Sequence, residues 1–425
     1  MKGDKRVVVV ICDSLRADLI GPGDTPFLVE LAERGTAFAA HRSVFPSTTR
    51  ASSASISTGC LPARHGLLGN TMALDEGEGL VCRNAGPPDF RDRMRRATGR
   101  TLRVPTLAER LRWHGEASIV FGNVSPGAAY FQDPDGHGWV YHAAGSFSPG
   151  AKPFDDPASA ALKKGIAGDQ AMTDRFCAEI VEDRAPALAL IWLSEPDYTG
   201  HHSPLGSPQH RAAIAAADKR VRQVFETVRR LDPAGEDILF LTGSDHGMET
   251  VSEAIDLSEL LVAAGIKTAP ESRDVVVAPQ GTGATIYFAE GARGKVAATV
   301  DFLSRENWAG RVVSDAELAQ VGLPTDTALR VAVAMATDER ANPHGVVGYG
   351  AIVSDPGDPE SKIGFGQHGG LGAHEQHPFL IAEGGGFAAR VEERATCLID
   401  IAPTVLRHLR MDHDDMDGQA LPLEA

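Results

Sequence analysis

Residues 6–13 read RVVVVICD, a short apolar run that ends at an acidic residue, Asp13. An uninterrupted run of β-branched side chains of this length is typical of a strand buried on both faces. Similar runs recur at Leu188–Leu193 (LALIWL) and Ile238–Thr242 (ILFLT), and an amphipathic stretch at about 209–231 separates them. This alternation predicts an α/β fold, a three-layer sandwich with a mostly parallel central sheet.

The same rhythm continues along most of the chain. Further strands are expected at Thr36–His41, Ala117–Phe121 and Phe379–Ala382. Further helices are expected from Pro26 to Gly35 with Thr25 as the cap, at Thr106–His114, and at Leu398–Leu409.

Two regions fit this rhythm poorly. Residues 72–103 are rich in Gly, Pro, Arg and Asp and are expected to form an irregular insertion. Residues 253–365 contain strands of their own, near Val275–Val277, Ala284–Phe288 and Val331–Met335, and are expected to form an inserted cap subdomain. The catalytic core would then comprise residues 1–252 and 366–425.

The composition bounds the class of protein. The 425 residues are 43% hydrophobic and 23% charged, with a formal net charge of −16, which is typical of a globular protein but not of a nucleic-acid scaffold. Five scattered cysteines without a CxxC pair indicate neither a disulfide framework nor a zinc knuckle. The apolar run before Asp13 is too short for a signal peptide, and no stretch approaches the ~20 apolar residues of a membrane span. A cytoplasmic location without membrane attachment is expected.

Acidic and imidazole side chains stand next to the predicted core strands. They are Asp13 after the first strand, Asp197 and His201 (EPDYTGH) after the second, Asp245 and His246 (SDHG) after the third, and His368 (GQHGG) before the last. Because ligands bind beyond the carboxyl ends of strands in open α/β sheets, groups from the first three strands are expected to converge on one rim. Zinc accepts this mixture of oxygen and nitrogen ligands, and six of them suit two ions about 3.5–4 Å apart that clamp a phosphoryl group.

A hydroxyl-rich segment provides candidates for a nucleophile. Residues 45–59 read FPSTTRASSASISTG, typical of a small-residue helix packed closely on the sheet. A hydroxyl at the start of that helix would lie beside backbone amides that favour an anionic substrate, and a metal ion would lower its pKa. The residues alone leave Ser47, Thr48 and Thr49 as alternatives.

Several separated segments together resemble one known family. VVVVICDSLRAD (7–18), TPFLVELAERGT (25–36) and VFPSTTRASSASISTGCLPARHGLLGN (44–70) are followed by EPDYTGHH, LTGSDHGM and FGQHGG. In this order they resemble the type I phosphodiesterase/nucleotide pyrophosphatase branch of the alkaline phosphatase superfamily. The resemblance covers roughly residues 6–70, 187–248 and 364–409, and leaves both insertions uncovered.

The resemblance implies a role for each site residue. Asp13, Asp245 and His246 would hold one zinc with Thr49 beside it, and Asp197, His201 and His368 would hold the second, although carboxylate-rich sites also accept Mn²⁺ or Mg²⁺. Thr49, nine residues before Thr58, would be the nucleophile. Asn70 would help to bind a non-bridging phosphoryl oxygen. Arg50-Ala51-Ser52 replaces the aromatic-Pro-Asn of the eukaryotic relatives, so that Arg50 would either contact a second anionic group or cover the helix end.

Two competing assignments carry less weight. Cys60-Leu61-Pro62-Ala63-Arg64 fits the C-x-P-x-R pattern of sulfatases, but the Thr-Gly pair precedes this cysteine instead of following it. His374 could compete with His368 as a ligand, but the HGG context of His368 matches the family.

We therefore expect a metal-dependent hydrolase that cleaves phosphodiester or pyrophosphate bonds through a phospho-threonine intermediate. Its substrate would be a small phosphate ester, with a nucleotide as one option. The alternatives are a phosphonate hydrolase of the phosphonoacetate type, a phosphomonoesterase or a phosphoryl transferase with the same site. A non-catalytic binding module is the remote alternative.

Overall fold

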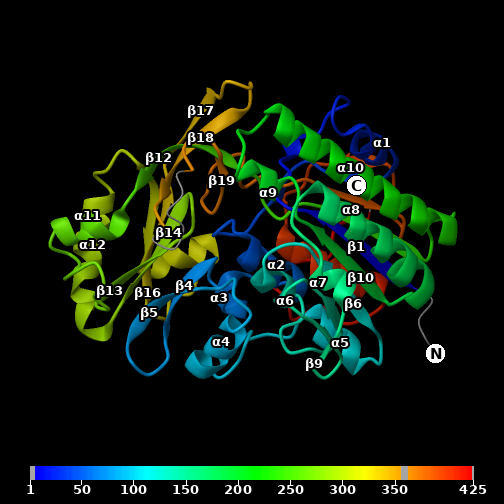
Figure 1. Cartoon of the computed structure of the whole chain (residues 1–425). Helices are drawn as coiled ribbons and strands as arrows, with labels where there is room; N and C mark the ends of the chain where they lie inside the picture. Colours follow the sequence, from blue (N-terminus) through cyan, green and yellow to red (C-terminus); the bar gives the residue numbers. More distant parts are fainter. Residues whose placement is uncertain (1–4, 356–361, 424–425) are drawn as a thin grey trace.

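The computed structural model describes residues 5–355 and 362–423, which form two parts side by side (Figure 1). The larger part is built on a ten-stranded sheet. Its strands, in spatial order, are β21 (Arg390–Glu392), β2 (Thr36–Phe38), β20 (Leu380–Glu383), β11 (Ile238–Gly243), β1 (Arg6–Cys12), β10 (Leu188–Leu193), β6 (Ser118–Gly122), β7 (Trp139–Tyr141), β8 (Ser146–Ser148) and β9 (Lys152–Phe154).

The five central strands, β11, β1, β10, β6 and β7, run parallel to one another. Strand β20 pairs antiparallel with β11, and β8 and β9 continue antiparallel from β7. The predicted fold class, an α/β protein with a mostly parallel central sheet, is therefore confirmed.

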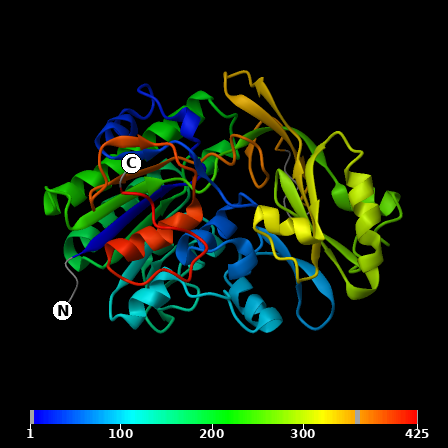
Figure 2. The ribbon, with the colours of Figure 1, turned by 180° about the vertical axis from the view of Figure 1, so that it is seen from behind.

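Strand β1 is buried on both faces, as its unbroken apolar run predicts. Val7, Val9 and Ile11 pack into one hydrophobic layer, and Val8 and Val10 pack into the opposite one. The first layer is covered by α2 (Thr49–Thr58), α5 (Leu107–Trp113), α6 (Pro126–Tyr130) and α13 (Ile401–His408). The second is covered by α1 (Pro26–Arg34), α8 (Ile166–Arg175), the π-helical η2 (Phe176–Arg184) and α10 (Pro208–Leu231). Figure 2 shows the red helix α13 on the face opposite α10.

The smaller part contains two four-stranded sheets. One has the order β17 (Thr337–Ala341), β18 (Val347–Val353), β12 (Glu249–Ile255) and β19 (Gly366–Gln367). The other has the order β13 (Val275–Pro279), β14 (Gly283–Phe288), β16 (Leu329–Met335) and β15 (Ala309–Ser314). Helices α11 (Leu257–Ala263) and α12 (Val296–Leu303) pack against the second sheet. The three strands expected in this region lie within β13, β14 and β16.

Residues 72–103 are more regular than their composition suggests. Strands β4 (Thr71–Asp75) and β5 (Leu80–Asn84) form an antiparallel hairpin, and α4 (Phe90–Thr98) follows. Leu74 and Phe90 are buried against the β13–β14–β16 sheet, while Glu76 forms ion pairs with arginines of the hairpin and of α4. The expectation of an irregular insertion is wrong, because buried apolar side chains anchor the segment although glycine, proline and charged residues dominate its composition.

Some local boundaries also differ from the expectation. The strand expected at 36–41 ends at Phe38, and β3 (His41–Arg42) pairs separately with β22 (Thr396–Cys397). Thr25 does not cap α1 through its side chain, because its hydroxyl bonds to the backbone of Gly21. The remaining elements are η1 (Ala17–Leu19), α3 (Pro62–His65), α7 (Pro157–Ala160), α9 (Asp197–Gly200), η3 (Glu290–Lys295), η4 (Asp315–Val321) and η5 (Leu398–Asp400). Among the described helices, none has the length and apolarity that crossing a bilayer requires.

Candidate metal centre

Three aspartates meet at the carboxyl ends of neighbouring parallel strands. Ile11 of β1 is in register with Trp192 of β10 and with Gly243 of β11, so the three strands end at the same level. Asp13 follows β1 directly, Asp197 begins α9 just after β10, and Asp245 follows β11. The rim expected from the sequence is therefore where the structure places these residues.

The first group of side chains surrounds Nε2 of His246. This atom lies 3.1 Å from Oδ2 of Asp245 and 3.6 Å from Oδ1 of Asp13. It also lies 3.1 Å from Oγ1 of Thr49. Asp13, Asp245 and His246 are all buried and offer ligand atoms within 4.8 Å of one another, which suits a single metal ion.

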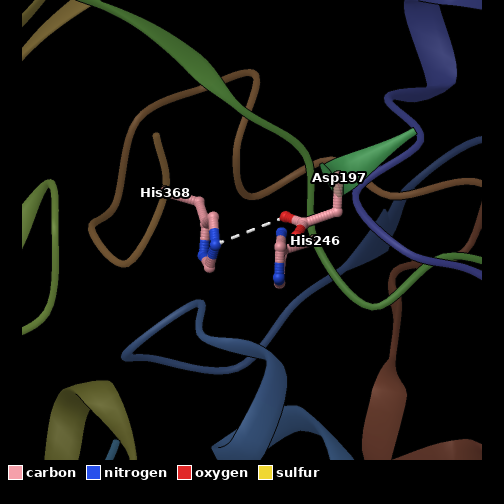
Figure 3. Close-up of side chains that lie close together, drawn as sticks. All are labelled: Asp197, His246 and His368. Carbon is pink, nitrogen blue, oxygen red and sulfur yellow. Dashed lines mark ion pairs between the residues drawn. The ribbon is translucent and has the colours of Figure 1, made fainter. Parts of the chain in front are cut away.

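The second group is centred on Asp197 and adjoins the first. Oδ1 of Asp197 lies 3.2 Å from Nε2 of His201 and 3.6 Å from Nε2 of His368. The rings of His246 and His368 stack with their centroids 3.7 Å apart, so His246 also offers a ligand atom to this group (Figure 3). The resemblance to the family implied that His246 belongs to the first group alone, whereas the geometry places it between the two.

The three imidazoles share one hydrogen-bonding arrangement, in which Nδ1 contacts a backbone carbonyl. The contacts are His201 to Gly366 at 3.0 Å, His246 to Gly247 at 3.0 Å and His368 to Ser47 at 2.8 Å. Because a carbonyl oxygen only accepts, each Nδ1 carries a hydrogen, and in the neutral ring Nε2 presents a lone pair. This is the arrangement by which a backbone carbonyl orients an imidazole as a metal ligand.

The carboxylates also have the chemistry of metal ligands. Oδ1 of Asp13, Oδ1 of Asp197 and Oδ2 of Asp245 are buried and accept no hydrogen bond from the described part of the chain. A buried carboxylate oxygen without a donor is costly, and a bound cation removes that cost. Carboxylate oxygens and imidazole nitrogens directed at the same spaces fit two divalent cations.

Burial and neighbouring charges shift the pKa values of the side chains in this centre. Burial and the carboxylates of Asp245 and Asp197 hold the pKa of Asp13 well above its usual range. Burial and the neighbouring His246 hold the pKa of His368 well below its usual range. A divalent cation reverses both effects, since it stabilises the ionised carboxylate and the neutral imidazole together.

Of the three hydroxyls that the sequence left as candidates, Thr49 lies beside this centre. It is the first residue of α2, and it lines the cavity next to His246. The Ser47 hydroxyl instead contacts the carbonyl of Gly370 and the carboxylate of Glu375. The Thr48 hydroxyl is buried without a hydrogen bond and does not line the cavity.

Asn70 and Arg50 line the same cavity as Thr49 and contact each other. Oδ1 of Asn70 accepts from the Arg50 amide at 3.3 Å, which leaves the Nδ2 group of Asn70 as a donor for a ligand. The Arg50 guanidinium donates to the carbonyl of Asn70, to Asn84 and to Ser125 at 2.7, 3.0 and 3.2 Å. Arg50 thus fastens α2 to the β4–β5 hairpin in addition to lining the cavity.

The cavity over the centre has a volume of about 430 Å³. The site residues that line it are Asp13, Thr49, Arg50, Asn70, Asp197, His201 and His368, and the other lining residues are Val124, Ser125, Lys164, Ser194, His202, Lys362 and Gln367. Neither Lys164 nor Lys362 is among the site residues expected from the sequence. Both lie in segments without periodicity, far along the chain from the motifs. None of the described residues that line the cavity is Phe, Tyr or Trp.

Two adjoining metal-ligand groups and a hydroxyl at a helix end lie together at the carboxyl edge of a parallel sheet. This combination is typical of one class of protein, the metal-dependent phosphoester hydrolases of the alkaline phosphatase superfamily. Within it, the chain belongs to the type I phosphodiesterase/nucleotide pyrophosphatase family, whose model matches residues 7–317. The resemblance noted from the sequence and the hydrolase class are thereby confirmed. No curated protein matches the chain in sequence.

Two solved structures illustrate the likeness in fold. Murine ectonucleotide pyrophosphatase/phosphodiesterase 5, an inactive variant in complex with AMP, has a TM-score of 0.70 at 18% identity, over 98% of this chain and 97% of that one. Phosphonoacetate hydrolase from Sinorhizobium meliloti in complex with phosphonoacetate has a TM-score of 0.68 at 18% identity, over 96% of each chain.

Proposed function

We propose that the protein hydrolyses phosphodiester or pyrophosphate bonds of a small phosphate ester at a two-zinc centre, through a phospho-threonine on Thr49. The observation that carries this proposal is the position of Thr49. Its Oγ1 lies 3.1 Å from Nε2 of His246, and the residue lines the cavity together with Asp13 of the first metal-ligand group and Asp197, His201 and His368 of the second. Family membership supports a phosphoester substrate. The AMP bound to the murine neighbour supports a nucleotide as one option.

The metal ligands divide between two cations. Asp13, Asp245 and His246, together with Thr49, would hold one zinc, and Asp197, His201 and His368 the other, with His246 within reach of both. When bound, the cations would lower the pKa of the Thr49 hydroxyl and offset charge on the phosphoryl group.

The chain's own groups position the reacting atoms. Oγ1 of Thr49 forms a bond to phosphorus as the bond to the leaving oxygen breaks on the opposite side, and the leaving group takes up a proton. Backbone amides at the start of α2 and Nδ2 of Asn70 hold the non-bridging oxygens. Water then cleaves the phospho-threonine, which releases the phosphate product and restores the hydroxyl.

A substrate panel under defined metal loading tests this function. Protein stripped with a chelator is reloaded with zinc, manganese or magnesium and assayed on a nitrophenyl phosphodiester, a nitrophenyl monoester and phosphonoacetate. We expect the stripped protein to be inactive and zinc to restore turnover, with the diester cleaved faster than the monoester. Protein that binds two equivalents of zinc and leaves the diester at the background rate would contradict the proposal.

The basic lining of the cavity favours phosphonate hydrolysis as a second candidate. Beyond the metal-ligand groups, the ionisable side chains lining it are Arg50, Lys164, His202 and Lys362. Cationic side chains suit a substrate with a second anionic group, and the described lining residues include no Phe, Tyr or Trp ring on which a base could stack. Phosphonoacetate, which the Sinorhizobium neighbour binds, has such a group in its carboxylate.

Replacing Lys164 with alanine separates the two candidates. The exposed Lys164 side chain lines the cavity and acts electrostatically on Asp13. If a substrate carboxylate pairs with it, K164A should raise the KM for phosphonoacetate by about tenfold, the equivalent of one charge-assisted contact. The nitrophenyl diester has no second anion, and its KM should change less than about twofold. The matched control is K163A, because the neighbouring exposed lysine does not line the cavity. Equal effects on both substrates would contradict the pairing.

A further inference from the structure

The loop after β19 contains a buried carboxylate to which the proposed mechanism assigns no role. This residue, Glu375, is 0% exposed and lies seven residues after His368 in the sequence HGGLGAHE. Its carboxylate accepts five hydrogen bonds: from Oγ of Ser47 at 3.1 Å, from Oγ1 of Thr282 at 2.5 Å, and from the amides of Gly369 at 2.6 Å, Gly370 at 2.8 Å and Gly372 at 2.9 Å. Three of the five donors are thus backbone amides from the four residues after His368.

These hydrogen bonds connect His368 to the start of α2. The carbonyl of Ser47 accepts the hydrogen of Nδ1 of His368 at 2.8 Å, while the Ser47 hydroxyl contacts Glu375. The Gly369 amide lies 3.0 Å from the same hydroxyl. Ser47 stands two residues before Thr49, so one carboxylate holds the backbone on either side of the centre, at His368 and next to Thr49.

The glycines of this loop allow the backbone to wrap closely around the carboxylate. A Cβ atom on Gly370 would lie 2.7 Å from Oε1 of Glu375. Gly369 has a φ of +125°, which favours glycine, and a Cβ there would clash with the carbonyl of Gln280. The pair after His368 is therefore needed for the approach of its amides to Glu375.

Hydrogen bonds, and not an opposite charge, stabilise this carboxylate. Within the described residues, no lysine or arginine forms an ion pair with Glu375. Burial raises its pKa, and the bonds from Thr282 and from the amides of Gly370 and Gly372 oppose that rise. Burial and the nearby Glu375 also raise the pKa of Glu249 to about 7. Burying a carboxylate costs free energy, and this one lies in a loop that carries a candidate metal ligand. We take this as an indication that Glu375 does more than fill space in the core.

We propose that Glu375 is a positioning residue that fixes His368 and the start of α2 relative to each other, and thereby sets the affinity for the second cation. This inference rests on the proposed function in taking His368 as a ligand of that cation. Glu375 itself touches neither the cations nor the substrate.

The test substitutes glutamine, which keeps the size of the side chain and replaces one acceptor oxygen with a donor. In E375Q, an NH₂ group would oppose amide or hydroxyl donors, so the loop should shift. Zinc binding is measured by competition with a chromogenic chelator, which does not depend on turnover. We expect two equivalents in the parent protein, and in E375Q a 10–100-fold weaker affinity for one equivalent with the other unchanged.

A matched control is available at the opposite end of β11. The buried Asp232 likewise accepts three backbone amides, from Glu236, Asp237 and Ile238, far from the centre. D232N should lower the Tm while both zinc equivalents keep the parent affinity. This control separates loss of a buried carboxylate in general from loss of positioning.

A second variant keeps the inference falsifiable if E375Q does not fold. S47A removes one donor to Glu375 and leaves the backbone carbonyl that holds His368, and we expect it to weaken the same zinc equivalent about threefold to tenfold. Parent affinity for both equivalents in folded E375Q, or in S47A where E375Q does not fold, would overturn the inference. Failure of the proposed function is distinct: the parent protein would bind two zinc ions without cleaving the diester, and the binding result would still decide the role of Glu375.

Discussion

Replacement of Thr49 with alanine is expected to lower kcat for a phosphodiester by about three orders of magnitude or more. The reason is the absence of a substitute hydroxyl. Ser47 is held by Gly370 and Glu375, and Thr48 does not line the cavity. With the Thr49 oxygen removed, no covalent intermediate forms, and only direct attack by water remains.

Two matched variants control this experiment. T49S keeps the nucleophilic oxygen and should retain turnover within about tenfold of the parent. S53A removes a buried hydroxyl from the same helix, one that bonds to the carbonyl of Ala128 at 2.5 Å, and should lower the Tm without a loss of rate. Mass spectrometry of parent protein acid-quenched during turnover of the diester should find on Thr49 the phosphoryl group with its remaining ester substituent. A folded T49A with full metal content and the parent rate would exclude the covalent mechanism.

The candidate nucleophile and the central strands share a property: a short local pattern of residues points to each of them. Strands β1, β10 and β11 are each one continuous apolar run, and an aspartate lies within four residues of the end of each. A parallel sheet aligns such ends, so strand order and spacing suffice to bring Asp13, Asp197 and Asp245 together. The local pattern also narrowed the candidates for the nucleophile to three hydroxyl groups, and the resemblance to the family then selected Thr49.

The features that escaped prediction depend on contacts between distant segments. The β4–β5 hairpin is stabilised by the ion pairs of Glu76 and by apolar contacts with β13, some two hundred residues further along the chain. The cavity residues Lys164 and Lys362 come from segments without a periodic pattern. The position of His246 between the two metal-ligand groups depends on the loop that carries His368. The motif SDHG places His246 next to Asp245 in the sequence but contains no information about that loop.

Replacement of His246 with alanine should therefore affect both cations. Its Nε2 atom lies 3.1 Å from Asp245 in the first group, and its ring stacks on His368 in the second. Removing the imidazole leaves two like charges, Asp13 and Asp245, as the remaining ligands of the first cation. It also removes one of the nitrogen atoms that lie near Asp197 at the second cation site. We expect the affinity for each zinc equivalent to fall by about a hundredfold or more and kcat at limiting zinc to fall by about a thousandfold.

The comparison with H201A makes this expectation specific. His201 contacts Asp197 alone among the three aspartates, so H201A should weaken a single zinc equivalent and leave the other at the parent affinity. H210A controls for loss of a buried imidazole, because His210 accepts a hydrogen bond from the amide of Gly206 near the start of α10 and lines no part of the cavity. If H246A weakens one equivalent only, as H201A should, His246 serves the first cation alone and its closeness to Asp197 and His368 reflects packing. Loss of both equivalents in H246A, with one lost in H201A, would establish His246 as the side chain that couples the two positions.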